Sequence, residues 1–156
     1  MMTWAPLGTT FRRVVVISLL IPITGFAAST LKGNAFIEDD GALRVRGKTI
    51  QLYGIHIPET ARTCRRSVRP AKCASRAALA LDFKVGTGFV ECAVHTKHGS
   101  RSLTAACYVD GEDLSAYLLR LGWAVALPDA PVEYVTLEKI ARSRKLGVWG
   151  FPIGEH

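Results

Sequence analysis

The sequence predicts a small α+β domain in which five strands form a closed sheet with helices packed on one side. Three observations favour this class. They are an alternating hairpin over residues 43–55, two further runs rich in Val, Phe, Tyr and Cys at residues 88–94 and 103–109, and three segments with helical spacing. The chain has 156 residues, which is the length of one domain with a real core.

The first residues have the pattern of an export signal. Arg12 and Arg13 precede an apolar run at residues 14–26, and the Gly-Phe-Ala of residues 25–27 places small residues as signal peptidase requires. The run is shorter than the ~20 apolar residues of a membrane-spanning helix. We therefore expect residues 1–27 to be a cleaved signal peptide, no transmembrane span in the mature chain, and a periplasmic or secreted protein. An uncleaved N-terminal anchor is the alternative.

A polar lead-in and a first strand are expected next. Residues 28–34 look like a linker, residues 35–38 begin the first strand, and the Asp-Asp-Gly of residues 39–41 favours a turn or bulge.

A basic hairpin follows this turn. In residues 43–46 Leu and Val alternate with Arg, as in a half-buried strand, and Gly47-Lys48 is the expected turn. The second arm, residues 50–55, runs toward Pro58, which cannot continue a ladder. The hairpin thus delivers the loop around Glu59 to one end of the sheet, where chemistry is often found.

The remaining elements follow from hydrophobic spacing and caps. A helix at residues 74–85, capped by Gly86, precedes the two strands above, and Asp110-Gly111 forms a turn after them. A second helix at residues 114–121 lies between Asp113 and Gly122, and a short extended piece follows at residues 123–126. The last helix runs from Pro131 to about Lys145 and is ended by Gly147, and Trp149 is expected to pack back on the core.

Four cysteines follow the signal, and an even number in an exported chain predicts two disulfides. Of the three possible connectivities, a hairpin turning at Gly99-Ser100 favours Cys92 with Cys107, because these residues lie symmetrically about the turn. Cys64 and Cys73 would then form the second bond. A zinc site is the alternative, although the chain has no C-x-x-C spacing.

The chain is basic, with a formal net charge of +7. Loss of residues 1–27 removes two arginines and no acidic residue, which leaves +5. Such a balance favours polyanionic partners through attraction that salt screens, although solubility alone would also explain it. Residues 60–72 concentrate part of this charge and form either an anion-binding loop or a solvated crossing.

The order of elements and several motifs resemble the thermonuclease family, the staphylococcal nuclease-like domains. The motifs are the turn before Leu43-Arg44-Val45, Leu-Tyr-Gly-Ile-x-x-Pro-Glu at residues 52–59, the two cysteine pairs, Asp-Gly-Glu-Asp-Leu at residues 110–114, Gly-Trp-Ala at residues 122–124, and Leu-Gly-Val-Trp-Gly at residues 146–150. The resemblance covers residues 35–152 and leaves residues 153–156 as a tail. It implies a five-stranded OB-fold β-barrel with three helices, and we expect a monomer.

Family members that cut nucleic acid hold calcium on two aspartates and a backbone carbonyl, because a hard cation stabilises the charge of the transition state. By the resemblance, the first aspartate falls on Gly41, with Asp40 beside it. In an extended chain that offset directs Asp40 to the opposite face, unless a bulge intervenes. The second aspartate falls on His56, a poor calcium ligand, and Ile57 replaces a threonine.

The family also grips the phosphate with two arginines and uses a glutamate as general base. Glu59 matches the base, although it could instead pair with Arg62. Gln51 replaces the first arginine and offers no charged fork. The second falls on Arg101 if the loop at residues 95–104 has one extra residue, and on Ser102 otherwise.

We therefore expect the fold to persist and the nuclease chemistry to be lost. Glu59 and Arg101 remain the catalytic candidates, and Asp40 and His56 the metal candidates. No cofactor is expected, and Ca²⁺ only if activity remains. A borderline cation held by these residues with His95 or His98 is a further alternative.

Three functions follow. The leading hypothesis is non-catalytic binding of nucleic acid or an acidic polysaccharide by a basic face. Its residues would be Arg44, Arg46, Lys48, Arg62, Arg65, Arg66 and Arg69. The second hypothesis is a calcium-dependent phosphodiesterase that acts on DNA or RNA. The third is a scaffold for an envelope protein, which an exposed apolar patch would favour.

Overall fold

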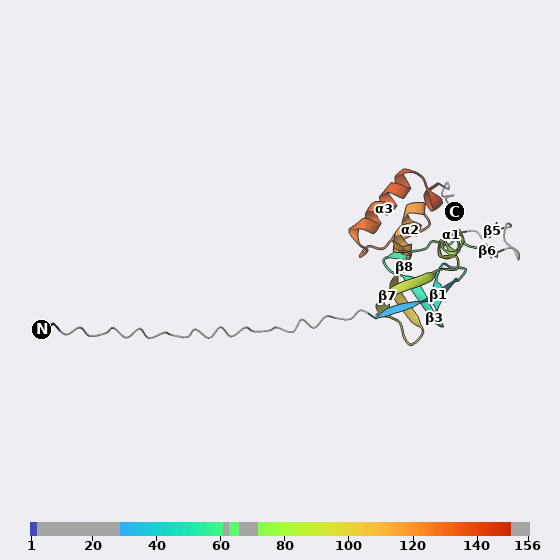
Figure 1. The fold of residues 1–156 in the computed structure, drawn as a ribbon. Coiled ribbons are helices and arrows are strands. Elements are labelled where there is room, and N and C mark those ends of the chain that lie inside the picture. Colours follow the sequence, from blue (N-terminus) through green and yellow to red (C-terminus); the bar gives the residue numbers. More distant parts are fainter. Residues whose placement is uncertain (3–28, 61–62, 66–71, 151–156) are drawn as a thin grey trace.

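The computed structural model describes residues 1–2, 29–60, 63–65 and 72–150, with the backbone alone for residues 63–65 and 72–74. Within these residues, five strands close into a mixed β-barrel accompanied by three helices (Figure 1). The predicted α+β class and barrel are confirmed at this level, as an OB-fold-like arrangement.

The barrel is built from β1 (Thr30–Ile37), β2 (Leu43–Val45), β3 (Lys48–Leu52), β7 (Phe89–Lys97) and β8 (Ser102–Val109). Neighbouring strands are antiparallel except at the closing seam, where β3 runs parallel to β8 with Gln51 opposite Thr104. Short strands complete the sheets, namely β4 (Ile55–His56) with β10 (Val125–Ala126), β5 (Thr63–Arg65) with β6 (Lys72–Ala74), and β9 (Glu112–Asp113) on β8.

The first strand begins at Thr30, earlier than expected. Residues 30–34 pair with β7 and residues 35–37 pair with β2, so β1 is shared by two neighbours as the barrel curves. Polar Lys32 and Asn34 face solvent in this strand, which is why their composition indicated a linker.

The turn of the basic hairpin lies one residue earlier than expected. Val45 pairs with Lys48, and the two residues between them, Arg46 and Gly47, have φ of 50° and 74°. Two residues with positive φ form the type I′ turn that matches the twist of a hairpin. Beyond Leu52 the second arm breaks at Gly54 and resumes as β4.

Three helices cover the barrel: α1 (Arg76–Val85), α2 (Leu114–Leu121) and α3 (Val132–Ser143), followed by the 3₁₀ turn η1 (Gly147–Gly150). In Figure 1, α2 and α3 lie together at one end of the barrel. Trp149 lies against α3, with Arg142 4.2 Å above its ring, rather than in the main core. No helix in the described residues has the length and apolar character to cross a membrane.

The start of α2 joins the layers through two neighbouring carboxylates. Asp113 accepts hydrogen bonds from the amides of Ser115 and Ala116 at 2.7 and 3.2 Å, so it caps the helix as predicted. Its other oxygen accepts a hydrogen bond from the Tyr134 hydroxyl at 2.5 Å, which ties α3 to α2. Burial and this bond raise the pKa of Tyr134.

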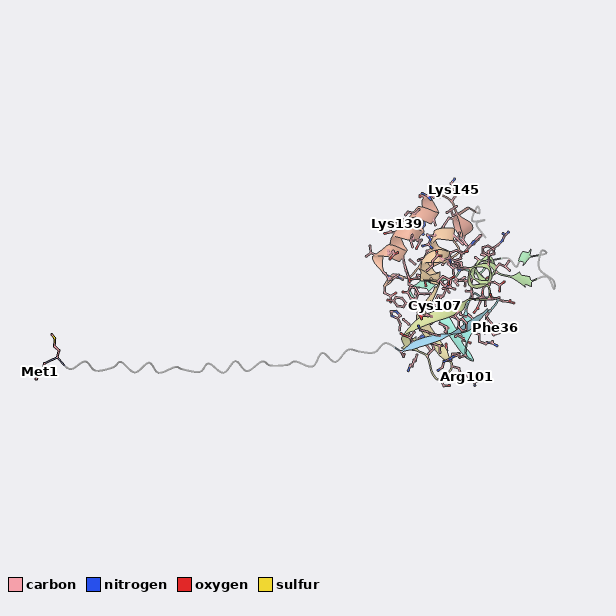
Figure 2. The ribbon with its side chains drawn as sticks, viewed as in Figure 1. Met1, Phe36, Arg101, Cys107, Lys139 and Lys145 are labelled. Carbon is pink, nitrogen blue, oxygen red and sulfur yellow. A yellow bond between two sulfur atoms is a disulfide. The ribbon has the colours of Figure 1, made fainter. Side chains whose placement is uncertain are left out.

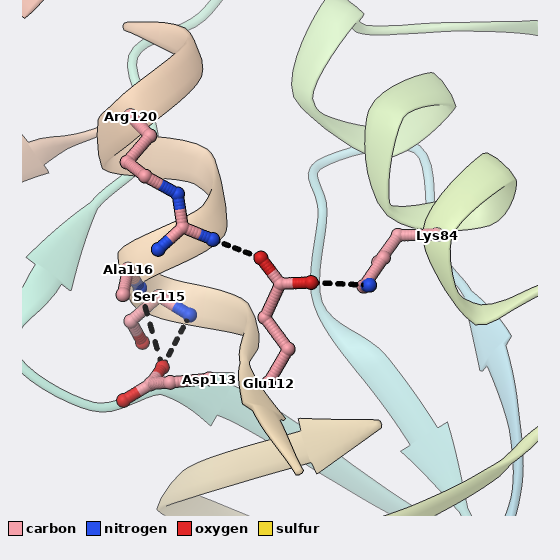
Figure 3. A network of polar contacts seen from close by, with 6 residues as sticks. All are labelled: Lys84, Glu112, Asp113, Ser115, Ala116 and Arg120. Atoms are coloured by element: carbon pink, nitrogen blue, oxygen red, sulfur yellow. Dashed lines mark hydrogen bonds and ion pairs between the residues drawn. The ribbon is translucent and has the colours of Figure 1, made fainter. Parts of the chain in front are cut away.

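Glu112 connects two helices beside this cap. It forms ion pairs with Lys84 of α1 and Arg120 of α2 (Figure 3). The hydrogen bond from Lys84 lowers the pKa of Glu112. Because these side chains are partly exposed, the pairs orient the helices more than they stabilise them.

The predicted Cys92–Cys107 disulfide is confirmed. The two residues are direct partners on β7 and β8, with Cα atoms 4.0 Å apart, and both are buried. Cys64 lies opposite Cys73 in the β5–β6 register, but their side chains lie outside the described ones, and the second disulfide stays a prediction.

Candidate functional site

A pocket of about 250 Å³ opens where β3 ends and β4 begins, and we call it the β3–β4 pocket. Its described lining residues are Asp40, Gln51, Leu52, Ile55, His56, Ile57 and Glu59. The sequence predictions that placed chemistry at the end of the second hairpin arm thus fall on one concavity.

Backbone contacts hold the loop that forms this pocket. Gly54 turns the chain between β3 and β4 with a φ of 72°, and a Cβ there would lie 3.0 Å from the ring of Tyr134. His56 pairs with Val125 of β10, and the Gly54 carbonyl accepts a hydrogen bond from the amide of Leu127 at 3.0 Å. The position of His56 is therefore fixed by the chain that follows α2.

Asp40 faces the same pocket as Glu59, contrary to the expectation from strand alternation. The expectation fails because Asp40 lies in a turn, where the period of two does not apply. The Gly41 amide donates to the Glu38 carbonyl at 3.0 Å, and the Ala42 amide donates to Asp40 Oδ1 at 2.9 Å. One oxygen of Asp40 is thereby already used by the turn.

The neighbouring position 41 lies against a hydrophobic side chain. Gly41 has a φ of 91°, and a Cβ placed on it would lie 2.7 Å from Cδ1 of Ile57. The space beside Asp40 is thus filled by hydrocarbon. Among the described residues, no three His, Cys, Asp or Glu side chains converge closely enough to hold a metal ion.

The two catalytic candidates are not brought together. Arg101 lies at the start of β8, where its carbonyl accepts a hydrogen bond from the amide of Thr49 at 2.8 Å, whereas Glu59 follows the far end of β3. The residue opposite Gln51 across the seam is Thr104, about 10 Å along the strand from Arg101. Arg101 does not line the β3–β4 pocket.

An adjoining groove of about 400 Å³ shares Gln51 and His56 with the pocket and continues along β8. It adds Thr104, whose hydroxyl lies 2.9 Å from Nε2 of His98, and Asp129. The described residues of the pocket and the groove include no Lys or Arg. Sequence reasoning missed both residues, because the register of the β3–β8 seam places Thr104 here and the pairing of β10 with β4 brings the loop with Asp129 to the same groove.

The predicted basic face separates into three groups. Arg44 is held by Glu38, at 2.9 Å from Nε and 2.5 Å from Nη2, so its charge is locally matched. Arg62, Arg66 and Arg69 lie outside the described residues, as does the side chain of Arg65. Arg46 and Lys48 lie at the hairpin turn, away from the β3–β4 pocket.

A small hollow of about 130 Å³, which we call the barrel mouth, lies at that turn. Its described lining residues are Ser29, Thr30, Leu31, Lys48, Val94, Lys97 and Leu103. Arg46 reaches across to β1, with Nε 3.8 Å from where a Cβ of Gly33 would be. Figure 2 shows Arg101 at this end of the molecule and Lys139 and Lys145 of the α3 region at the other.

The cations around the barrel mouth are free of acidic partners among the described residues. Arg46, Lys97 and Arg101 form no ion pair with them, and Lys48 Nζ lies 3.4 Å from the carbonyl of Ser100. These positive charges are therefore unmatched among the described residues.

No family model matches the chain, and no curated protein matches it. The fold, the β3–β4 pocket and the barrel mouth therefore carry the functional inference.

Proposed function

We propose that the chain is an exported thermonuclease-like domain that binds polyanions at the barrel mouth and has lost calcium-dependent cleavage. The resemblance in sequence motifs supports the family, and the mixed five-stranded barrel is compatible with it. The observation that carries the loss of cleavage is that position 41 is a glycine, which has no carboxylate to offer a metal ion.

In the family, position 41 would carry the first calcium ligand. Here Ile57 Cδ1 lies 2.7 Å from the place of a Cβ, so an aspartate would require that side chain to move. His56 stands where the family has its second carboxylate, and Gln51 stands where it has its first arginine. Arg101, the candidate for the second arginine, lies at the other end of β3. Among the described lining residues of the β3–β4 pocket, a phosphodiester bound there would meet the carboxylates of Asp40 and Glu59 and no Lys or Arg that compensates their charge.

The barrel mouth offers the opposite electrostatics. Arg46, Lys48, Lys97 and Arg101 present four cations without described acidic partners, and long-range attraction to phosphate or sulfate groups follows. Arg44, with Glu38 beside it, contributes less than its sequence position indicated.

Binding is tested by fluorescence anisotropy with labelled single-stranded DNA and labelled heparin over a salt series. We expect affinity to fall steeply with salt, with a slope near −0.7 per phosphate contacted for a single strand. The variant Lys48→Gln/Lys97→Gln should weaken both ligands and lower the slope by about 1.4 for DNA. The control Lys139→Gln/Lys145→Gln, with the same charge change on exposed α3-end residues, should have little effect. Equal losses in both variants would contradict the assignment.

A second candidate is a residual phosphodiesterase, favoured by Asp40, His56 and Glu59 lining one pocket. The assay incubates the oxidised protein with DNA or RNA and Ca²⁺, Mg²⁺, Mn²⁺ or Zn²⁺, alongside Glu59→Gln. We expect no metal-dependent cleavage. Cleavage abolished by Glu59→Gln, an exposed and structurally tolerant site, would replace the proposal.

A third candidate is a protein-binding scaffold, favoured by exposed aromatic residues on the outer sheet. Phe36 and Phe89 are 74% and 70% exposed, and Phe89 pairs with Asn34, two residues from Phe36 on the same face of β1. Two exposed rings on neighbouring strands form an apolar patch that a partner could cover. Phe36→Ser/Phe89→Ser should leave the free energy of unfolding nearly unchanged, and a pull-down from envelope extract that loses a partner on this change would support the scaffold.

A further inference from the structure

Two phenylalanine rings lie exposed on neighbouring strands of the outer barrel face. Phe36 of β1 and Phe89 of β7 are 74% and 70% exposed. Phe89 pairs with Asn34, which is two residues from Phe36 on the same face of β1. Diagonal neighbours of this kind have Cα atoms about 7–8 Å apart. We call these two rings the aromatic platform.

The rest of this face is polar. Thr30, Lys32 and Asn34 are the other exposed residues of β1, and Lys32 forms an ion pair with Glu91 of β7. The two rings therefore interrupt a polar surface, and the packing of the core does not require them there, because they contribute little to it.

Unmatched positive charge lies along the same strand. Thr30 lines the barrel mouth and shares the exposed face of β1 with Phe36, six residues away, which is about 20 Å along a strand. Arg46 reaches into this interval, since its Nε lies 3.8 Å from where a Cβ of Gly33 would be. A chain of a few nucleotides thus spans the distance from the mouth to the aromatic platform.

The α3 end also has exposed cations, but its aromatic ring is already covered. Lys139 and Lys145 are exposed there, whereas Trp149 is partly buried and Arg142 lies 4.2 Å above its ring. Figure 2 shows Phe36 on the barrel, in the half of the molecule away from these lysines. Of these two ends, as described, only the barrel combines unmatched cations with two neighbouring open rings.

This combination favours single-stranded nucleic acid over other polyanions. Each base that stacks on an aromatic ring adds roughly 5- to 150-fold in affinity. Sulfated polysaccharides have no bases, and the bases of a duplex are already stacked on one another. A protein partner fits less well, because two phenylalanine rings exposed to this extent offer about 300 Å², less than half of the roughly 800 Å² that each partner buries in a standard interface.

We propose that the aromatic platform stacks two bases of a single-stranded nucleic acid whose phosphates are held by the cations of the barrel mouth. This inference rests on the proposed binding of polyanions at the mouth and names the polyanion. It places base contacts on the outer face of β1 and β7, which is separate from the β3–β4 pocket.

Fluorescence anisotropy on the full-length, oxidised chain tests the platform with labelled single-stranded DNA, duplex DNA and heparin. Phe36→Ser/Phe89→Ser should weaken single-stranded DNA roughly 30-fold, which is about fivefold for each stacked base. Binding of heparin and duplex DNA should change less than twofold. Because this variant removes no charge, the salt slope for single-stranded DNA should stay the same, whereas Lys48→Gln/Lys97→Gln lowers it.

Phe83→Ser on α1 is the matched control, since Phe83 is also 74% exposed. It should change the affinity for single-stranded DNA less than twofold. Phe36→Tyr/Phe89→Tyr should keep the affinity, because tyrosine also stacks on bases. Circular dichroism and urea unfolding confirm that all variants fold. A loss for Phe83→Ser equal to that at the platform, or a loss of heparin binding equal to that of single-stranded DNA, would overturn the proposal.

Photocrosslinking locates the bases without any substitution in the protein. Single-stranded DNA that carries 5-iodouracil is irradiated in complex with the chain, and mass spectrometry of peptides identifies the linked residue. Crosslinks at Phe36 or Phe89 are expected. Crosslinks confined to residues of the β3–β4 pocket or of the α3 end would overturn the proposal.

The heparin arm separates this inference from the proposed function. If both ligands depend on Lys48 and Lys97 but neither depends on the rings, polyanion binding at the mouth stands and base stacking fails. If neither ligand depends on the lysines, the proposed function fails, and the strand path from the mouth to the rings fails with it. Loss of a protein partner from Phe36→Ser/Phe89→Ser, with unchanged DNA affinity, would assign this face to the scaffold instead.

Discussion

Replacing Gly122 with alanine tests a close backbone crossing between the end of α2 and the residues before η1. Gly122 ends α2 with a φ of 73°, and a Cβ there would lie 2.4 Å from the carbonyl oxygen of Leu146. The Val148 amide donates to the Gly122 carbonyl at 2.9 Å, so the two segments are held together by the bond that separation would break. The added methyl group can therefore be accommodated only by a backbone shift that weakens this hydrogen bond.

A matched control is available at Gly47. This glycine has a φ of 74°, and a Cβ placed on it would meet no atom within 4 Å. Both substitutions incur the left-handed penalty of about 1 kcal/mol. Overpacking against backbone adds about 1–3 kcal/mol at Gly122 alone. Gly47→Ala should thus cost about 1 kcal/mol, and Gly122→Ala about 2–4 kcal/mol.

Urea unfolding followed by far-ultraviolet circular dichroism measures both losses under oxidising conditions, with two-state behaviour checked by a second probe. Equal losses in the free energy of unfolding for the two variants would refute the reasoning, since they would show that the backbone at Gly122 shifts to accept the methyl group without destabilising the fold. A change in the slope with urea would instead indicate an altered unfolded or native state.

Three further predictions follow from the fold. Tyr134→Phe should lower the free energy of unfolding by about 1–2 kcal/mol at pH 8, because Asp113 loses a buried donor. Burial and Asp113 raise the pKa of Tyr134 in the folded state. The stability that its hydroxyl contributes is therefore complete below the pKa of an unfolded tyrosine, near 10, and is lost as pH rises above that value. The wild-type protein and Tyr134→Phe should thus have similar free energies of unfolding in urea at about pH 11 and above. Cys92→Ala/Cys107→Ala should cost about 3 kcal/mol in the same assay, as expected for a bond that closes a loop of 15 residues. Millimolar Ca²⁺ should leave the Tm unchanged relative to EDTA, whereas a rise with Ca²⁺ concentration would reveal a binding site in the folded state.

Much of the fold follows from local signals. The helix from Leu114 to Leu121 was expected at its observed bounds, because Asp113 and Gly122 are strong caps on an apolar stripe. The Cys92–Cys107 bond followed from their symmetry about a polar turn. The start of β1 was missed because its exposed lysine and asparagine resemble a linker, and only pairing with β7 makes them a strand.

The candidate site was predictable in part. The end of the second hairpin arm correctly indicated the position of Glu59, because strand and proline signals are local. The presence of Asp40 in the same pocket depends on a turn, and the distance of Arg101 depends on the register of the β3–β8 seam. Neither can be read from the spacing of residues along the chain.

The same seam has a consequence for how the domain is made. Leu52 finds its partner only in Ala105, so β3 keeps one open edge until nearly all of the intervening chain is in place. Closure over so long a separation is slow relative to hairpin formation. A nascent chain that is synthesised only up to the loop before Ser102 therefore has no sealed barrel, and chaperones would meet it in an open form.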